Sequence, residues 1–204
     1  MNVVDPDELL PPYAGIRLAD VHLVRTPLDA AAALAALMQA DVVGFDTESK
    51  PTFAKGEVST GPHLVQLATD DVAYLFQVGS AASAQTVLTV LGPVLESETI
   101  LKVGFGLGDD LKRLRGKLGI ETRNVLDLST ALRQRGERNT LGAKTAVARF
   151  FGQRLQKSRR ITTTNWATAQ LSEKQVQYAA DDAHVALKLY RYWKNHPPVT
   201  PGAS

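Results

Sequence analysis

Two carboxylates, Asp46 and Glu48, follow an apolar run in the first quarter of the chain. The run from Val42 to Glu48 is rich in β-branched and aromatic residues and too short for a helix, which predicts a strand. Side chains alternate between the two faces of a strand, so both acids share one face, with Cα atoms roughly 6.5–7 Å apart. Such a pair is most often a solvated strand end. With further acids beside it, mutual repulsion would favour a bound cation.

A third acid, Asp110, lies near the start of a predicted helix. Four leucines at helical spacing define the buried stripe of that helix: Leu107, Leu111, Leu114 and Leu118. Asp110 lies at the edge of this stripe, whereas Asp109 turns away by about 100° and fits a first-turn residue that the helix dipole stabilises. The preceding Gly104–Gly108 segment reads Gly-x-Gly-x-Gly, which departs from the Gly-x-Gly-x-x-Gly dinucleotide fingerprint. A dinucleotide site is therefore not favoured.

The last predicted helix presents a phenol and a carboxylate together. Ser172 and Gln175 have the spacing of a capping box, which begins the helix. Tyr178 and Asp182 are four residues apart, so they share one partly buried face. Alone, this pair would most often indicate packing and a hydrogen bond. The pair indicates a candidate functional site only because the chain also contains Asp46, Glu48 and Asp110.

Charge is distributed unevenly along the chain. Residues 1–111 carry 15 acidic and five basic side chains, whereas residues 112–160 carry 14 basic and three acidic ones. A basic stretch joined to an acidic half favours a polyanionic partner such as nucleic acid over a merely solvated surface. The connection that contains Lys157, Arg159 and Arg160 ends in Trp166, for which we expect a structural role as an anchor in the core.

The elements that must position these residues alternate between strands and helices. Strands are predicted at 17–24, 42–48, 63–68, 72–78, 99–105 and 123–127. Helices are predicted at 28–40, 81–95, 107–118, 128–135 and 141–151, and after Ser172. The pair 63–68 and 72–78 has a hairpin pattern, and the long loop 49–62 is typical of functional or mobile segments. We expect one α/β domain at 17–194, with a mixed sheet of about five or six strands flanked by helices, between flexible segments 1–16 and 195–204.

Composition excludes several classes of protein. The chain has no cysteine, which rules out disulfide frameworks and cysteine-based metal sites or nucleophiles. The longest apolar run, Ala30 to Met38, is far shorter than the ~18 residues of a membrane span. The acidic N-terminus lacks the features of a signal peptide. We expect a cytoplasmic protein with no membrane association and no obligatory protein partner.

Together, Asp46-x-Glu48, Asp110 and Tyr178-x-x-x-Asp182 resemble the DEDD 3′-5′ exonucleases of the ribonuclease H-like (DnaQ-like) fold. Tyr178 is similar to the third-motif tyrosine of the branch that contains ribonuclease D and the Werner exonuclease domain. The likeness covers about Val21 to Trp193. Its blocks are Val-Gly-Phe-Asp-Thr-Glu, Leu-Val-Gln-Leu-Ala, Gly-Phe-Gly-Leu-x-x-Asp-Leu-x-x-Leu, Thr-Asn-Trp and Gln-x-x-Tyr-Ala-Ala-x-Asp-Ala.

The resemblance implies a metal-dependent exonuclease that releases nucleoside 5′-monophosphates from the 3′ end of DNA or RNA. It implies two divalent cations, and oxygen-only ligands suit Mg²⁺ or Mn²⁺. Asp46 would bridge the two ions, and Glu48 and Asp182 would complete the site that activates water. Asp110 would hold the second ion through its waters. Tyr178 would position the attacking water by a hydrogen bond.

Four further residues are predicted to contact the substrate: Thr47, Phe53, Phe105 and Lys157. Phe53, in the long loop, suits either stacking on the terminal base or anchoring of the loop, and Lys157 suits a phosphate. Two alternatives remain on the same fold: a catalytically weak nucleic-acid-binding module and a ribonuclease H-type endonuclease. The presence of Tyr178 disfavours the endonuclease.

Overall fold

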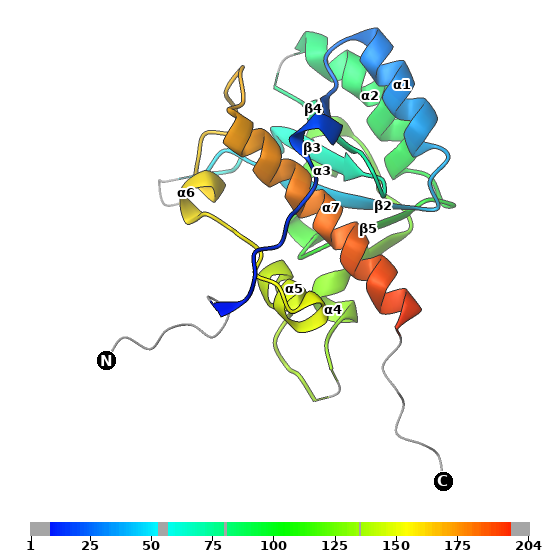
Figure 1. The fold of residues 1–204 in the computed structure, drawn as a ribbon. Coiled ribbons are helices and arrows are strands. Elements are labelled where there is room, and N and C mark those ends of the chain that lie inside the picture. Colours follow the sequence, from blue (N-terminus) through cyan, green and yellow to red (C-terminus); the bar gives the residue numbers. More distant parts are fainter. Residues whose placement is uncertain (1–8, 53–56, 80, 135, 197–204) are drawn as a thin grey trace.

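Six strands form a single mixed sheet in the order β1-β4-β3-β2-β5-β6 (Figure 1). The structure, a computed structural model, describes residues 9–52, 57–79, 81–134 and 136–196. β3 pairs antiparallel with β2 and with β4, and the other neighbouring strands are parallel. The predicted α/β fold with a mixed sheet of five or six strands is confirmed.

The strands fall in the predicted segments but are mostly shorter. They are β1 (Val21–Leu23), β2 (Val42–Glu48), β3 (Leu64–Ala68), β4 (Ala73–Gln77), β5 (Leu101–Gly104) and β6 (Val125–Asp127). The strand predicted at 17–24 is the clearest difference, because its first half is a 3-10 helix, Leu18–Asp20. The Arg17 guanidinium donates to the Asp20 carboxylate at 2.7 Å, and the Asp20 amide donates to the Arg17 carbonyl. These local bonds tighten the chain before β1 begins.

The helices are α1 (Pro27–Leu37), α2 (Ala81–Leu95), α3 (Gly108–Leu118), α4 (Leu128–Ala131), α5 (Ala143–Phe151), α6 (Arg159–Thr162) and α7 (Glu173–Asn195). The predicted capping box that starts α7 is present, with Ser172 and Gln175 bonded reciprocally. The helix predicted at 128–135 is too long, because the chain turns after Ala131 and the Gln134 amide donates to Glu137. α6 is a single helical turn in a stretch that was predicted as an irregular connection.

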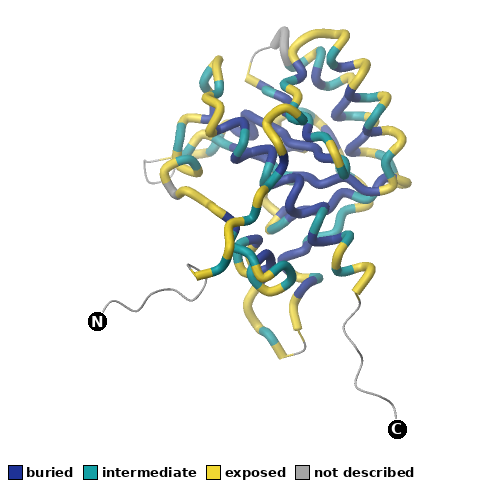
Figure 2. The backbone as a smooth tube through the Cα atoms, viewed as in Figure 1, coloured by how far each residue is buried: buried dark blue, intermediate teal, exposed yellow. Residues whose placement is uncertain are grey.

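Helices cover both faces of the sheet, and the central strands β2, β3, β4 and β5 are mostly buried, whereas the edge strands β1 and β6 are not (Figure 2). α1, α2 and α3 share a core with one face, to which β2 contributes Val43 and Phe45. α4, α5 and α7 cover the other face, to which β2 contributes Val42. Because side chains alternate along a strand, Asp46 and Glu48 also face the α7 layer. Both acids therefore lie on the face of the sheet that packs against α7.

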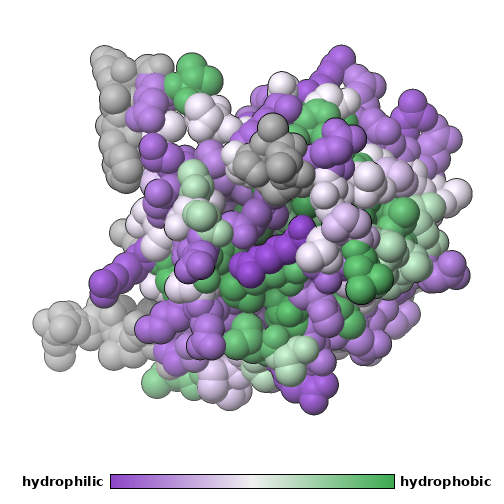
Figure 3. All heavy atoms as spheres, turned by 90° about the horizontal axis from the view of Figure 1, so that it is seen from above, coloured by the Kyte–Doolittle hydropathy of each residue, from purple (hydrophilic) through white to green (hydrophobic). Residues whose placement is uncertain are grey.

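On the face seen from above, apolar side chains are interleaved with hydrophilic ones (Figure 3). The large apolar side chains that are exposed come from separate segments: Leu9, Leu18, Leu28, Met38, Val58 and Tyr192. Within the described residues, none of the helices combines the length and the apolar character that crossing a membrane requires.

A glycine in β2 allows α7 to lie very close to the sheet. A Cβ atom on Gly44 would collide with the backbone carbonyl of Ala183, which belongs to the central part of α7. Backbone at this position cannot move without displacing the whole helix. Asp182, the residue before Ala183, is thereby held opposite Asp46.

Replacing Gly44 with alanine should destabilise the protein, because the added methyl group overpacks the contact between β2 and α7. We expect a loss of about 1–3 kcal/mol in the free energy of unfolding, measured by denaturant titration. The matched control is Gly116→Ala in α3, where an added Cβ meets open space. This control should gain up to about 1 kcal/mol from helix propensity. Equal stability of the two variants would contradict the assigned contact.

Candidate active site

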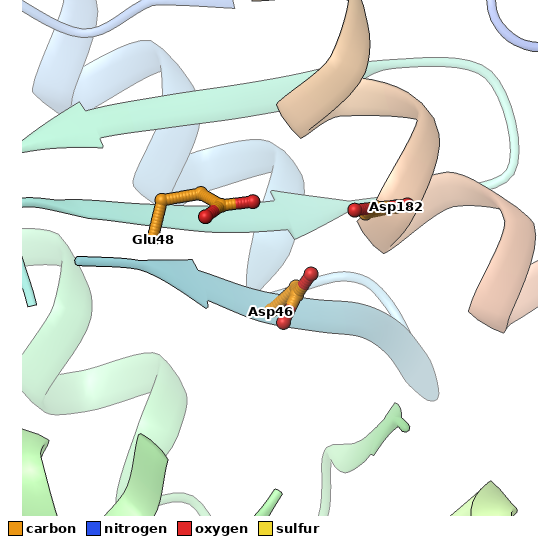
Figure 4. A group of neighbouring side chains, drawn as sticks. All are labelled: Asp46, Glu48 and Asp182. Atoms are coloured by element: carbon orange, nitrogen blue, oxygen red, sulfur yellow. The ribbon is translucent and has the colours of Figure 1, made fainter. Parts of the chain in front are cut away.

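Three carboxylates converge between β2 and α7 (Figure 4). Asp46 and Glu48 extend from β2 and Asp182 extends from α7, and each offers one oxygen within 4.8 Å of the others. Glu48 and Asp182 are largely buried, with exposed fractions of 9% and 7%. The structure thus brings together three of the four acids that were predicted to bind metal.

The fourth predicted acid, Asp110, lies beside this cluster in the first turn of α3. Its Oδ1 atom accepts a hydrogen bond from the Thr47 hydroxyl at 2.5 Å and lies 3.7 Å from the Arg113 guanidinium. It is not part of the group within 4.8 Å, yet its charge raises the pKa of both Asp46 and Glu48. Asp110 therefore forms the outer edge of the site.

Asp127, which was not predicted as part of the site, fixes the loop that leads to Asp110. Its carboxylate accepts from the backbone amides of Gly106 and Leu107 at 3.0 Å and from that of Ser129 at 2.9 Å. Gly106 has a positive φ of 67°, which suits glycine at this turn. Asp127 ends the strand predicted at 123–127 and directly precedes the helix predicted at 128–135. This position, where Asp commonly caps a helix, is the sequence signal that could have identified it.

The segment from Thr162 to Trp166 supports Tyr178. The phenol oxygen lies 3.1 Å from the Thr162 hydroxyl, and the Trp166 indole donates to the Thr162 carbonyl. Trp166 is 1% exposed, with its ring centroid 6.0 Å from that of Tyr178, so its predicted anchoring role is confirmed. Burial and the nearby Asp182 raise the pKa of Tyr178 above its ordinary value, so the phenol stays protonated at neutral pH.

Burial and mutual repulsion disfavour charge on the clustered acids. Burial, together with the neighbouring Asp182, holds the pKa of Asp46 well above its ordinary range. Burial, followed by the charge of Asp46, raises the pKa of Glu48 to about 9. Burial also raises the pKa of Asp110 and of Asp182. A divalent cation would relieve this repulsion, and carboxylate oxygens are the ligands that Mg²⁺ and Mn²⁺ prefer. The donor set therefore fits such ions.

Lys157, predicted as a phosphate contact, reaches the edge of the same cluster. Its Nζ atom lies 2.8 Å from Asp182 Oδ1 and 5.7 Å from the ring centroid of Tyr178. Burial, the largest single influence, works against its charge, but Asp182, Tyr178 and Asp46 together outweigh burial and raise the pKa of Lys157. The lysine is therefore a cationic member of the site.

Many other charges of the basic stretch are paired within the protein. Among the described residues, ion pairs join this stretch to acids at Lys112–Asp109, Arg113–Asp110, Arg115–Glu121, Arg123–Glu98 and Arg149–Glu137. These pairs lie on different elements and most are exposed. The charge count along the sequence therefore overstates the positive charge that is free to meet a polyanion.

The remaining predicted substrate contacts lie in different environments. Phe53 falls outside the described residues. Phe105 follows β5 and is partly buried against the core shared by α4, α5 and α7. Thr47 is 8% exposed, and its hydroxyl is bonded to Asp110.

The fold and the carboxylate cluster define an α/β protein with a buried, oxygen-only site suited to divalent cations. A family model described as "3'-5' exonuclease" matches residues 21–196. The chain therefore belongs to the 3′-5′ exonuclease family of hydrolytic nucleases.

Among curated proteins, the chain is 32% identical over 166 residues to a 3′-5′ exonuclease of Arabidopsis thaliana, covering 79% of this chain and 55% of that protein. It is 28% identical over 156 residues to the bifunctional 3′-5′ exonuclease/ATP-dependent helicase WRN of Mus musculus, covering 76% of this chain and 11% of that protein. The chain thus matches only part of each of these proteins.

Solved structures show the same fold. The Nibbler EXO domain of Aedes aegypti superposes with a TM-score of 0.73 and 26% identity, covering 88% of this chain and 89% of that one. RNase D of Trypanosoma brucei in complex with RNA U12 superposes with a TM-score of 0.76 and 22% identity, covering 88% of this chain and 64% of that one. The predicted membership of the 3′-5′ exonuclease family is confirmed, and WRN and ribonuclease D are among the proteins to which the chain is similar.

Glu48→Gln should stabilise the metal-free protein at neutral and alkaline pH. The pKa of Glu48 rises from an ordinary value of 4.5 to about 9, so the folded state binds a proton more readily than the unfolded chain. Stability therefore falls as pH rises through this window, and the amide removes that loss. Melting in a chelator at pH 8 should show a higher Tm for the variant, and the gain should shrink as pH falls towards 4.5.

Glu121→Gln is the control for this effect, because Glu121 is an exposed acid paired with Arg115. Its melting temperature should stay close to that of the wild type at every pH. A Glu48→Gln variant that melts below the wild type at pH 8 would show that Glu48 and the neighbouring carboxylates do not repel one another as described.

Proposed function

We propose that this chain is a metal-dependent 3′-5′ exonuclease that hydrolyses DNA or RNA from the 3′ end and releases nucleoside 5′-monophosphates. The observation that carries the proposal is the buried convergence of Asp46, Glu48 and Asp182 within 4.8 Å. Buried acids of like charge destabilise a fold unless they hold a cation, so their convergence supports a role in metal-dependent chemistry.

The proposed metal site divides the acids between two divalent cations, Mg²⁺ or Mn²⁺. Asp46, Glu48 and Asp182 would hold one ion, and Asp46 and Asp110 would hold the other. When bound, such a pair of ions supplies the nucleophile and stabilises the charge on the attacking and leaving oxygens of the phosphodiester. The position of Asp110 at the edge of the cluster suits a ligand of the second ion through water.

Tyr178 would orient the attacking water. Because its pKa is raised by burial and by Asp182, the phenol acts as a hydrogen-bond partner and not as a base at neutral pH. The Thr162 hydroxyl lies within hydrogen-bond distance of the phenol oxygen, which restrains the position of that oxygen. The protein thus contributes positioning of the water rather than removal of its proton.

Lys157 would contact the phosphate that is cleaved. Its ammonium group already lies beside Asp182, close to where a bound phosphodiester would bring negative charge. Thr47 would act on the substrate through Asp110, to which its hydroxyl donates. Phe105 would support the site from the adjoining core, and Phe53 remains a predicted stacking residue.

No observation favours the alternative of a weak nucleic-acid-binding module, because all four acids and Tyr178 are present. The match to the Nibbler EXO domain and the RNA bound to the ribonuclease D neighbour support a nucleic-acid substrate. An endonuclease would release internal fragments, whereas the proposed activity releases mononucleotides.

Metal binding should stabilise the folded protein, because only the folded chain brings the acids together. At a hundredfold excess of Mn²⁺ over Kd, the free energy of unfolding should rise by about 2.7 kcal/mol. Thermal melting in Mn²⁺ and in chelator measures this difference, and Asp46→Asn should reduce it strongly. Identical melting of the wild type in both solutions would refute the metal site.

Asp110 and its neighbour Asp109 provide a matched pair for activity. Asp110 lies at the site, whereas Asp109 is exposed and pairs with Lys112 on the surface. We expect Asp110→Asn to lower kcat by about 10²–10³-fold, as for loss of one group that stabilises developing charge. Asp109→Asn should keep wild-type activity. Release of labelled mononucleotides from a 3′-labelled oligonucleotide measures both, and equal activity of the two variants would exclude Asp110 from catalysis.

A further inference from the structure

Gln66 carries a buried amide group with no partner. It lies in the middle of β3 and is 0% exposed. Neither Nε2 nor Oε1 has a hydrogen-bond partner among the described residues. A buried amide that forms no hydrogen bond is unfavourable, and buried polar groups that lack a partner often have a functional reason. An apolar side chain of similar size would pack this position without that penalty.

The strand register places Gln66 beside the carboxylate cluster. In the antiparallel pairing of β2 and β3, Gln66 lies directly opposite Asp46. Residues that are directly opposite project from the same face, with Cβ atoms about 4.5–5.5 Å apart. This is the face covered by α7, from which Asp182 joins the cluster. A glutamine side chain is long enough to span that separation.

Apart from Asp46, the residues directly beside Gln66 on its face are apolar, and the polar Glu48 of β2 and Gln77 of β4 lie diagonally from it, one pair further along the register. On its far side the register pairs it with Leu75 of β4, and along β3 the residues on its face are Leu64 and Ala68. The part of α7 that covers these residues contributes alanines to the same core, including Ala179 and Ala183. Asp46 is therefore the polar side chain that the register places directly opposite this amide.

We propose that Gln66 is a positioning residue of the metal site and that its Nε2 donates to the Asp46 carboxylate through one buried water. Asp46 Oδ1 already accepts from the Thr47 amide at 2.9 Å, so a second donor would fix the plane of the carboxylate. Groups that orient a metal ligand in this way typically change metal affinity or activity by about 10–100-fold. The inference rests on the proposed function, because it assigns Gln66 to the ligand that would bridge both ions.

The test compares Gln66→Leu with Gln77→Leu in the full chain. Gln77 lies on the neighbouring strand β4, and its amide already donates to the Thr168 carbonyl at 3.1 Å. Mn²⁺ affinity is measured by calorimetry without nucleic acid, stability by melting in chelator, and kcat and KM on a single-stranded oligonucleotide. Gln66→Met is measured in parallel, so that the test does not depend on one variant folding.

For Gln66→Leu and Gln66→Met we expect Mn²⁺ binding about 10–100-fold weaker than in the wild type. Their kcat should fall while KM stays unchanged, and their melting temperature in chelator should equal or exceed that of the wild type. Gln77→Leu should melt at a lower temperature and bind Mn²⁺ normally. A purely structural role for Gln66 would give the opposite pattern, with lower stability and unchanged affinity.

The outcomes separate this inference from the proposed function. If the wild type binds Mn²⁺ and the Gln66 variants bind it equally well, the positioning role is wrong and the metal site stands. If the wild type itself binds no Mn²⁺, the proposed function fails, and the role of Gln66 fails with it.

Discussion

The close approach of α7 to β2 is the constraint on which the site depends. Gly44 leaves room for the Ala183 carbonyl, and no larger residue could do so without moving the helix. Because Asp182 precedes Ala183, this contact sets the distance between the acid of the helix and the acids of the strand. Asp46 and Glu48 alone would be a pair of strand-end carboxylates. The packing of a glycine against a helix backbone turns them into part of a three-acid cluster.

That packing forces like charges into one buried space, and the electrostatics of the protein follow from it. The pKa of Glu48 rises to about 9, and that of Asp46 lies well above its ordinary range. Lys157 offsets part of this repulsion through its ion pair with Asp182. The buried acids thus favour the binding of positive charge at the place where the proposed phosphodiester substrate and its cations would lie. Under the proposed function, stability and activity are opposed at this cluster, as is common where acids are buried for chemistry.

Supporting contacts surround the cluster, and each restrains one residue of the proposed site. Thr162 contacts the phenol oxygen of Tyr178 and Trp166 packs near its ring. The Asp127 carboxylate accepts a hydrogen bond from the loop before Asp110. Gln66 would likewise restrain Asp46. These contacts come from loops and strands far from one another in the chain, so the precision of the site depends on the whole domain. A rigid surrounding of this kind is what keeps catalytic groups within productive geometry.

The sequence alone determined the elements whose signals are local. The limits of β2 and the capping box at Ser172 follow from alternation and from residues three apart. The shared face of Asp46 and Glu48 follows from the same alternation. Partners distant in sequence were decided by tertiary structure, as shown by the bond from Thr47 to Asp110 across 63 positions. No local pattern encodes such a bond, because it exists only after α3 has packed beside β2.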